Sequence, residues 1–338
     1  MAELRFAVLG TGFFSTFQIP AWFEVGGVKL VALYNRTVSK AEKLAEEYNV
    51  PCVYGDAEEL FKNENVDFVD IITEAPAHGP LVLLAAKYKV PVICQKPMAH
   101  DFNTCLKMVK ACKESGIPFF IHDNYRWFPP MLKVKKALKE GQIGNPFRAN
   151  VQLGTGGVKG LETQPYLKTL KHYALFDMGS HLFDLARFFF GEPQNIYCQT
   201  YTTTDQIVGE DVVSSVLRFG DVIFHGEITE RCNTQVYIEG TKGTIELDYK
   251  NILNIITEKN TIRIDCNKIS KRYPFLDNYI DEVMSDIRMQ AIVDCNRHFL
   301  RALKKNRNAD TSGEDNIKTM KIMFSAIESA EQDKLIRL

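Results

Sequence analysis

At 338 residues the chain is too long for one ordinary hydrophobic core, so two domains are expected. Hydrophobic residues make up 45% and charged residues 25%, and the net charge of -1 comes without a long basic run, which argues against nucleic acid as the main partner. No apolar run approaches the ~20 residues of a membrane span, and the first residues lack the apolar segment of a signal peptide, so neither a membrane partner nor export is expected.

The eight cysteines are scattered along the chain, and none forms a CxxC pair. This pattern is typical of reduced thiols in the cytoplasm and does not suggest a zinc centre. We therefore predict a cytoplasmic protein without a metal site.

Strand and helix signals alternate through the first 122 residues, which predicts an α/β fold with a parallel sheet and helices on both of its faces. Short apolar runs predict strands at Leu4–Leu9, Val28–Tyr34, Val66–Thr73, Val90–Cys94 and Ile117–Ile121. Helical patterns cover Ser39–Tyr48, Pro80–Tyr88 and Asp101–Glu114. We expect residues 1–122 to form a Rossmann-type dinucleotide-binding domain.

The first turn reads Gly10-Thr11-Gly12-Phe13-Phe14-Ser15, directly after the first strand. Two glycines let the backbone approach a pyrophosphate, and the helix that follows points free N–H groups at it. Gly10, Gly12, Phe13 and Phe14 are therefore predicted to contact a dinucleotide. Ser15 stands where a third glycine is usual, and a plain strand–turn–helix loop stays the alternative.

The second strand ends at Asn35-Arg36, where NAD-binding proteins usually carry a carboxylate for the ribose. An Asn–Arg pair would not repel a 2′-phosphate, and arginine can grip one through its planar fork. Asn35 and Arg36 therefore favour NADP, with NAD as the alternative cofactor. Arg36 stacking on adenine or facing solvent is the competing interpretation.

Three further positions are expected to lie near the cofactor. Thr73, the last residue of the third predicted strand, is expected to contact it. His78 is expected to cap or pack at a helix start nearby rather than to perform chemistry. The stretch Gln95-Lys96-Pro97 ends a buried strand with a lysine, a residue seldom buried without a partner, and we predict that Lys96 lies where cofactor and substrate meet. A solvated turn is the alternative.

The second half begins with a predicted helix at Met131–Glu140 and a strand at Phe147–Leu153. The glycine-rich stretch 154–160 is predicted to be a mobile loop on the substrate side. Tyr166 could face substrate, although packing is an equal interpretation. Asp177 and His181 are four residues apart, which places them on one face if the segment is helical, and such a pair suits proton transfer from an alcohol. A capping aspartate with an ordinary histidine is the alternative.

Residues 195–264 read as successive strands with glycine turns and no helix between them, which indicates an antiparallel sheet. One face of this sheet is expected to cover helices, and the other to form a subunit interface. Helices are predicted at Asp281–Leu303 and Asp315–Glu331. We expect residues 123–338 to form a substrate-binding and oligomerisation domain of a homodimer or homotetramer.

Four features in this order resemble the Gfo/Idh/MocA oxidoreductases: the glycine turn, Gln95-Lys96-Pro97, the run Asn124 to Trp127, and the run Asp177 to Asp184. The resemblance implies a Rossmann domain followed by an α/β domain with a large, mostly antiparallel open sheet. It implies that Lys96, Asp177 and His181 bind and deprotonate a hydroxyl beside the nicotinamide, and that Asn124 and Arg126 contact substrate.

Two departures from the family pattern stand out. Gln95 replaces the usual glutamate, which removes a negative charge beside Lys96 and the cofactor. Thr73-Glu74-Ala75 replaces the usual Thr-Pro-Asn, which puts the cofactor contacts of that loop in doubt. The Gln-Lys-Pro variant, with His122 to Trp127 and Gly209-Glu210-Asp211, looks most like the branch that contains D-apiose dehydrogenase.

The sequence therefore predicts an NAD(P)-dependent oxidoreductase that transfers hydride between a sugar or polyol and nicotinamide. Two alternatives stay open: an NAD-retaining glycosidase of the same fold, and a non-catalytic nucleotide-binding sensor.

Overall fold

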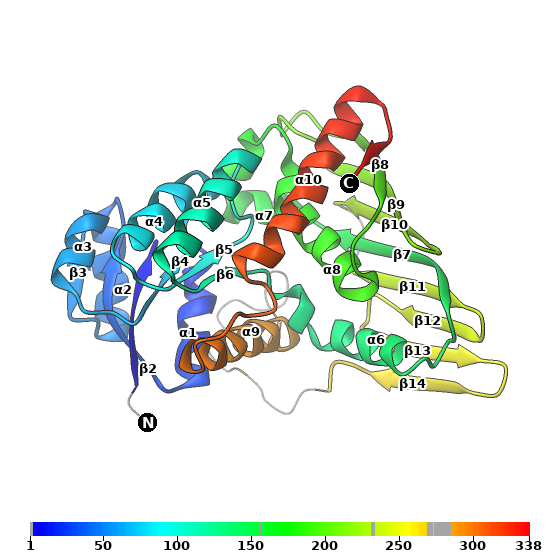
Figure 1. Cartoon of the computed structure of the whole chain (residues 1–338), viewed down its shortest axis with the longest axis horizontal. Helices are drawn as coiled ribbons and strands as arrows, with labels where there is room; N and C mark the ends of the chain where they lie inside the picture. Colours follow the sequence, from blue (N-terminus) through cyan, green and yellow to red (C-terminus); the bar gives the residue numbers. More distant parts are fainter. Residues whose placement is uncertain (1–2, 156, 231–233, 269–272, 274–284) are drawn as a thin grey trace. The chain divides into compact units, whose positions relative to one another are not determined.

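The computed structural model describes residues 3–155, 157–230, 234–268, 273 and 285–338 (Figure 1). Internal contacts divide the chain into two compact units, Met1–Asp123 with Ile292–Met320, and Asn124–Ala291 with Lys321–Leu338. The expected division at residue 122 keeps 123–338 in one piece, whereas residues 292–320 group with the N-terminal unit. None of the helices in the described ranges is long and apolar enough to cross a membrane.

The N-terminal unit contains a six-stranded sheet in the order β3-β2-β1-β4-β5-β6, with every neighbouring pair parallel. Its strands are β1 (Leu4–Leu9), β2 (Val28–Tyr34), β3 (Cys52–Tyr54), β4 (Phe68–Ile71), β5 (Val92–Gln95) and β6 (Phe119–His122). Its helices are α1 (Ser15–Val25), α2 (Val38–Tyr48), α3 (Ala57–Asn63), α4 (Ala75–Lys87) and α5 (Phe102–Ser115). The expected Rossmann-type sheet is confirmed; β3 and α3 were not expected.

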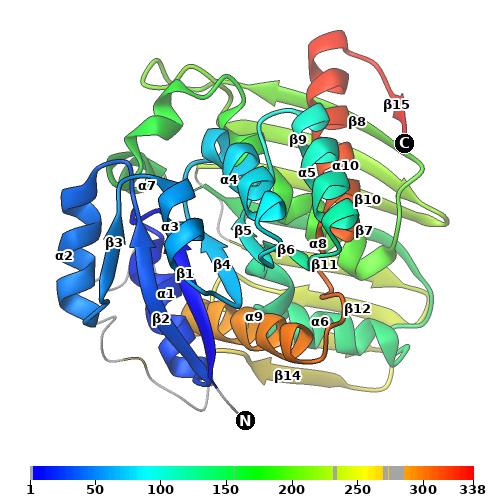
Figure 2. The ribbon, with the colours of Figure 1, turned by 60° about the vertical axis from the view of Figure 1, so that its left-hand side comes forward.

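Capping residues fix the ends of several of these helices. The side chain of Asp101 accepts a hydrogen bond from the Thr104 N–H at the start of α5, and Gly116 ends that helix in the left-handed conformation. Helices α4 and α5 pack against each other and lie side by side in Figure 2. The strands between these helices end at the carboxyl edge of the sheet, where parallel sheets bind ligands.

Residues 292–320 join this unit through specific bonds to β6. The hydroxyl of Thr311 donates to the carbonyl of Ile121, whose own N–H donates to the Thr311 carbonyl. The ring of Phe299 stacks on Phe120, with 5.3 Å between centroids. These contacts explain why this late segment groups with the N-terminal sheet.

The C-terminal unit contains a nine-stranded sheet in the order β14-β13-β12-β11-β7-β10-β9-β8-β15. Only β7 and β10 pair in parallel among these described strands, so the expected mostly antiparallel sheet is confirmed. The strands are β7 (Pro146–Gly154), β8 (Asn195–Tyr201), β9 (Val212–Phe219), β10 (Val222–Thr229), β11 (Gln235–Gly240), β12 (Gly243–Leu247), β13 (Ile252–Thr257), β14 (Thr261–Asp265) and β15 (Ile336–Arg337).

The helices of this half are α6 (Pro129–Lys139), α7 (Gly157–Thr163) and α8 (Ser180–Phe190), followed by α9 (Asp286–Lys304) and α10 (Gly313–Gln332), which each contribute residues to both units. The glycine-rich stretch that was expected to be a loop forms α7 from Gly157 onward, which corrects that prediction; Gly156 lies outside the described residues. The start of the helix expected at Asp281 also lies outside them.

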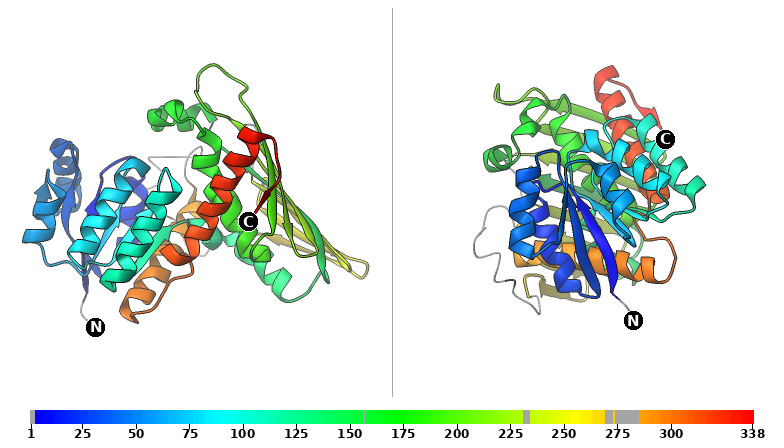
Figure 3. Two further views of the ribbon diagram at one scale, coloured as in Figure 1. Left: turned by 45° about the horizontal axis from the view of Figure 1, so that its top comes forward. Right: turned by 90° about the vertical axis from the view of Figure 1, so that its left-hand side faces the viewer.

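Burial alternates along the strands of the nine-stranded sheet, as a sheet with one covered face requires. Helix α8 packs on β7 and β10, and α6 packs on β13. The left view of Figure 3 shows the sheet nearly edge-on, with α8 in green on one of its sides. The residues on the opposite face are mainly polar and half-exposed.

Candidate active site

The glycine turn after β1 has one position that only glycine can occupy. Gly10 has a φ of +106°, and a Cβ there would lie 2.3 Å from the carbonyl oxygen of Ile72 and 2.5 Å from Cγ2 of Thr73. A Cβ on Gly12 would meet nothing within 4 Å. Gly10 is therefore required for packing against the end of β4, whereas the space at Gly12 is open for a ligand.

The same turn offers hydrogen-bond donors. The backbone N–H groups of Gly12, Phe13 and Phe14 donate to no residue that the structure describes, and the hydroxyl of Ser15 donates to the Gly12 carbonyl at 2.6 Å. Successive free N–H groups at the start of a helix are suited to bind phosphate. The side chains of Phe13 and Phe14 pack edge-on against Phe17.

Two buried hydroxyls beside the turn also lack a protein partner. Within the described part of the chain, Oγ1 of Thr11 and Oγ1 of Thr73 form no hydrogen bond. Buried polar groups are normally paired, and leaving one unpaired costs about 1–3 kcal/mol. The free N–H groups, the open space and these hydroxyls together fit a dinucleotide at this edge of the sheet.

Asn35 and Arg36 follow β2 at the same edge. Oδ1 of Asn35 accepts a long hydrogen bond of 3.4 Å from the Thr11 N–H, and its Nδ2 donates to the Thr37 carbonyl at 2.9 Å. Arg36 is exposed and forms no hydrogen bond or ion pair with another described residue. Asn35 therefore ties the two strand ends together, and the Arg36 guanidinium is free to meet a ligand.

His78, in the first turns of α4, connects two loops of this edge. Its Nε2 lies 3.0 Å from the Thr73 carbonyl oxygen, and its Nδ1 lies 3.0 Å from that of Pro97 and 3.3 Å from that of Met98. Burial lowers the pKa of the His78 imidazole, although the carbonyls oppose this effect. His78 is 0% exposed, so it holds the loops after β4 and β5 together from within the protein and presents no surface to the cofactor.

Lys96 follows β5 and is partly exposed at the end of the strand. The Lys96–Pro97 peptide bond is cis. Gln95, the last residue of β5, is buried, and its Nε2 donates to Oε1 of Gln18 on α1. The N-terminal unit thus brings the glycine turn, Asn35, Thr73 and the Lys96 loop to one edge of its sheet. Gly10 packs against Thr73, Thr11 bonds to Asn35, and His78 connects Thr73 to the loop after Lys96.

In the C-terminal unit, Asp177 lies in a π-helical turn, Leu175–Gly179, that runs directly into α8. His181 lies in the first turn of α8 and is 4% exposed. Its ring stacks on Tyr125, with centroids 4.0 Å apart and planes inclined by 21°. Both residues therefore share one continuous helical segment, which is the condition under which the sequence placed them on one face. Asp177 lies in its π turn, and such turns are frequent at functional sites.

Glu210 fixes the start of this segment. Its Oε1 accepts from the Leu175 N–H at 3.0 Å, and its Oε2 lies 3.5 Å from Nδ1 of His172. Gly209 is required because a Cβ there would lie 2.5 Å from the Leu170 carbonyl oxygen. Glu210 therefore orients the turn that carries Asp177.

Arg126, which was expected to contact substrate, forms an ion pair with Asp184 of α8. Its Nε donates to Oδ2 of Asp184 at 2.6 Å and its Nη2 to Oδ1 at 2.7 Å, and Asp184 is 0% exposed. This bidentate pair uses the in-plane N–H donors along one edge of the guanidinium, so Arg126 supports α8 through Asp184. Asn124 is half-buried at the start of the same loop. Tyr166 packs against a core cluster of Leu161, Leu167, Tyr173 and Ile207, which favours the packing interpretation.

Sequence reasoning gave no role to Tyr125 and Glu210, although both lie in the motifs of the resemblance, and it missed Tyr173. Tyr173 is 2% exposed, and its hydroxyl has no hydrogen-bond partner among the described residues. Burial raises the pKa of Tyr173 to about 12, and the charge of Asp177 adds to the effect, which places the two residues in one electrostatic neighbourhood. Only the position of Tyr173 four residues before Asp177 could have pointed to it.

A parallel sheet with a glycine turn and ligand-ready groups at its carboxyl edge defines a dinucleotide-binding protein of the Rossmann type. The chain belongs to the Gfo/Idh/MocA family of oxidoreductases. The model of the "Oxidoreductase family, NAD-binding Rossmann fold" matches residues 4–122, and that of the "GFO/IDH/MocA C-terminal domain" matches residues 131–246. The family resemblance seen in the sequence is confirmed.

Several named proteins are similar over nearly the full length. A D-apiose dehydrogenase of Rhizobium rhizogenes is 32% identical, over 99% of this chain and 98% of that protein. A myo-inositol 2-dehydrogenase of Thermotoga maritima is 24% identical, over 99% and 98%. The crystal structure of an oxidoreductase from Agrobacterium radiobacter in complex with NAD+, L-tartaric acid and magnesium superposes with a TM-score of 0.93 at 30% identity, covering 99% of this chain and 98% of that one.

Proposed function

We propose that the chain is an NAD(P)-dependent dehydrogenase that acts on a hydroxyl group of a sugar or polyol. The observation that carries this proposal is the pair of buried, unpartnered hydroxyls of Thr11 and Thr73 beside a glycine turn with free N–H groups. The similarity to a D-apiose dehydrogenase over nearly the whole of both chains supports the substrate class.

The proposal assigns a role to each of four residues. Bound nicotinamide supplies a carbon that accepts or returns the hydride. The Lys96 ammonium stabilises negative charge on the substrate oxygen. His181 takes the hydroxyl proton, and the stacked Tyr125 ring holds the plane of the imidazole for this transfer. Asp177 positions the substrate hydroxyls by accepting hydrogen bonds.

A screen of sugars and polyols, followed by the absorbance of the reduced nicotinamide, tests this proposal. Lys96→Ala should lower kcat by at least about 100-fold with nucleotide affinity nearly unchanged, whereas Lys107→Ala, at an exposed position on α5, should behave like the wild type. Turnover that survives Lys96→Ala would remove this lysine from the mechanism. Tightly held cofactor that never appears as free reduced nucleotide would instead favour the glycosidase alternative.

NADP is the proposed cofactor. The exposed Arg36 guanidinium and the uncharged Asn35 support it, because they offer a cation and no carboxylate to a 2′-phosphate. Arg36→Ala should lower kcat/KM for NADPH by at least about tenfold while leaving that for NADH nearly unchanged. Lys40→Ala, an exposed cation on α2, is the matched control. A wild-type preference for NADH would overturn this assignment.

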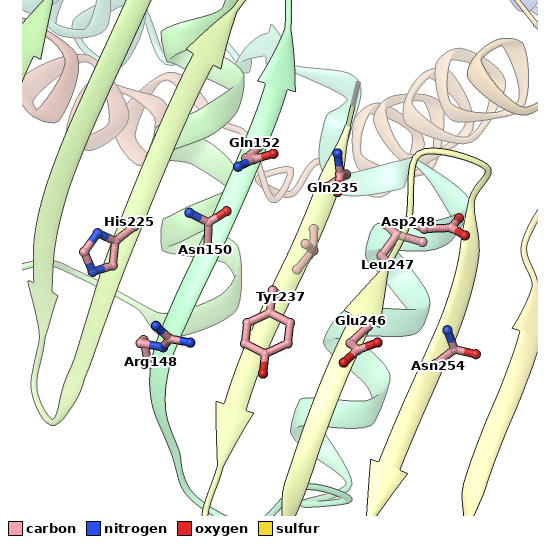
Figure 4. A pocket seen from close by; sticks show the side chains of 11 residues that line it. Arg148, Asn150, Gln152, His225, Gln235, Tyr237, Glu246, Leu247, Asp248 and Asn254 are labelled. Atoms are coloured by element: carbon pink, nitrogen blue, oxygen red, sulfur yellow. The ribbon is translucent and has the colours of Figure 1, made fainter. Parts of the chain in front are cut away.

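We further propose a homodimer or homotetramer assembled through the polar face of the nine-stranded sheet. This face has a hollow of about 520 Å³ between β7, β10, β11, β12 and β13, where Asn150, Tyr237, Glu246 and Asn254 lie across neighbouring strands (Figure 4). Val216 and Ile223 add exposed apolar side chains to strands of the same sheet.

Light scattering tests the assembly. Val216→Lys should lower the oligomer mass, whereas Leu106→Lys, at an exposed position on α5, should leave it unchanged. A monomeric wild type, or an unchanged oligomer in Val216→Lys, would contradict the proposed interface. The cytoplasm is the proposed location, supported by the free thiols of the described cysteines.

A further inference from the structure

A buried carboxylate in the middle of the parallel sheet is linked by hydrogen bonds to the strand end that carries Gln95. Asp70 lies on β4 and is 0% exposed. Nε2 of Gln18 lies 2.8 Å from both of its oxygens, and Nε1 of Trp22 donates to Oδ2 at 2.7 Å. Gln18 and Trp22 lie four residues apart on α1, so one face of this helix supplies both donors.

The carboxylate decides the orientation of two amides. An ionised carboxylate only accepts hydrogen bonds, so Gln18 must turn its NH₂ group toward Asp70. Oε1 of Gln18 then faces β5 and accepts from Nε2 of Gln95. Because Nε2 of Gln95 is used in this bond, its carbonyl oxygen is the group that can still accept a hydrogen bond, and no described residue donates to that oxygen.

The geometry of the sheet places Gln95 at the ligand edge. Asp70 pairs with Ile93 on β5, so Gln95, two residues further on, lies on the same face and one step closer to the carboxyl end of the strands. It directly precedes Lys96 and is 5% exposed. An acceptor at this position suits a hydroxyl or amide N–H of a reactant that binds at that edge.

We infer that Asp70 and Gln18 are positioning residues, which act through Gln95 so that its carbonyl oxygen, and not its NH₂ group, is presented beside Lys96. This inference rests on the proposed function for the identity of the bound reactants. It also explains why glutamine stands at residue 95: a glutamate there would point a carboxylate at the carbonyl oxygen of Gln18. Rotating the Gln18 amide would remove this repulsion, but it would turn the Gln18 carbonyl oxygen toward the Asp70 carboxylate and create the same repulsion there.

A four-corner set of variants tests the inference: wild type, Asp70→Asn, Gln95→Glu, and the two combined. Asp70→Asn lets both amides rotate, so Gln95 presents NH₂ and affinity for the reduced nucleotide or the sugar should fall about tenfold. Gln95→Glu alone should lower the Tm and that affinity. In the double variant each hydrogen bond can form in the opposite direction: the amide NH₂ at position 70 donates to the Gln18 carbonyl oxygen, and the Gln18 NH₂ donates to the carboxylate at position 95. This variant should therefore regain at least half of the loss in Tm and half of the loss in affinity.

Asp56→Asn combined with Gln95→Glu is the matched control, since Asp56 caps α3 away from this network and asparagine also caps helices. This control should show no recovery. Measurements belong at a pH well above 7, so that Asp70 is ionised, because burial raises its pKa to about 7. A double variant no better than Gln95→Glu, or a control that recovers equally, would overturn the inference.

One readout needs no ligand. The chain has two tryptophans, so the Trp22 indole N–H signal can be assigned by nuclear magnetic resonance with a Trp22→Phe variant. It should shift when Asp70 is replaced by asparagine and keep that shift in the double variant. A wild type that binds no nucleotide would refute the proposed function alone, whereas an indole signal insensitive to Asp70→Asn would refute the network itself.

Discussion

Replacing Arg126 by methionine distinguishes its predicted role in substrate binding from the role that its contacts support. The guanidinium donates two bonds to the fully buried Asp184 and is itself 11% exposed. Methionine keeps much of the apolar stem and removes the charge. The Nη1 atom of Arg187 then stays 3.9 Å from Oδ1 of Asp184, which is too long for a hydrogen bond.

The size of the effect follows from this environment. Removing one partner of a buried ion pair costs about 3–5 kcal/mol, and the remaining Arg187 charge keeps the loss near the lower end, about 3 kcal/mol. A unit of 150–250 residues loses about 2–4 °C of Tm per kcal/mol, so Tm should fall by about 6–12 °C. Lys171→Met removes an exposed ion pair with Glu331 in the same unit and should cost less than about 1 kcal/mol.

Differential scanning calorimetry and steady-state kinetics on the same preparations measure both roles. We expect Arg126→Met to lower Tm strongly, and the double variant with Asp184→Asn to regain part of the loss because the buried charge is then absent. A variant with unchanged Tm and a raised KM for the sugar would refute this reasoning and restore the substrate role of Arg126.

Three further predictions concern single positions. Gly10→Ala should destabilise the N-terminal unit, because its Cβ would lie 2.3 Å from a carbonyl oxygen, whereas Gly12→Ala should leave Tm unchanged and weaken nucleotide binding; equal Tm values for the two variants would contradict this. Tyr173→Phe removes a buried hydroxyl without a described partner, so urea unfolding should show no loss of stability, and a loss above about 1 kcal/mol would show that the hydroxyl is paired. Burial raises the pKa of Asp70 from 3.8 to about 7, so between these pH values the folded state holds a proton that the unfolded chain has released. The unfolding free energy should therefore fall by a few kcal/mol as pH rises from about 4 to about 7. If Asp70→Asn showed the same slope of unfolding free energy against pH, this pH dependence would not come from Asp70.

Features that depend on neighbouring residues were predictable from the sequence. The glycine turn, the five longer strands of the parallel sheet and the Asp101 cap each follow from residues within one turn or one strand. β3 was missed because its three residues are too few to show a period. The helix α7 was missed because glycine has a low helix propensity, which packing of the segment overrides.

Features that depend on distant residues were not predictable. The motif around Arg126 indicated a residue near substrate, but its partner Asp184 lies 58 residues away, and nothing local marks the pair. The sequence left open whether the segment that carries Asp177 and His181 is helical, and the structure has a π turn there that continues into α8. That turn is fixed by Glu210, 35 residues away from the N–H group whose hydrogen bond it accepts.

The substitution of glutamine for the family's usual glutamate at residue 95 illustrates the same limit at the site itself. Seen alone, it removes a negative charge beside Lys96. In the structure, a carboxylate is present on the adjacent strand, and Gln18 links it to Gln95. The Gln18 amide couples the orientation of the Gln95 amide to the Asp70 carboxylate, but it does not carry the negative charge to the strand end. The end of β5 therefore keeps a hydrogen-bond acceptor, the Gln95 carbonyl oxygen, without the negative charge of a glutamate. A protein with this arrangement should therefore tolerate glutamate at residue 95 only when Asp70 is made neutral.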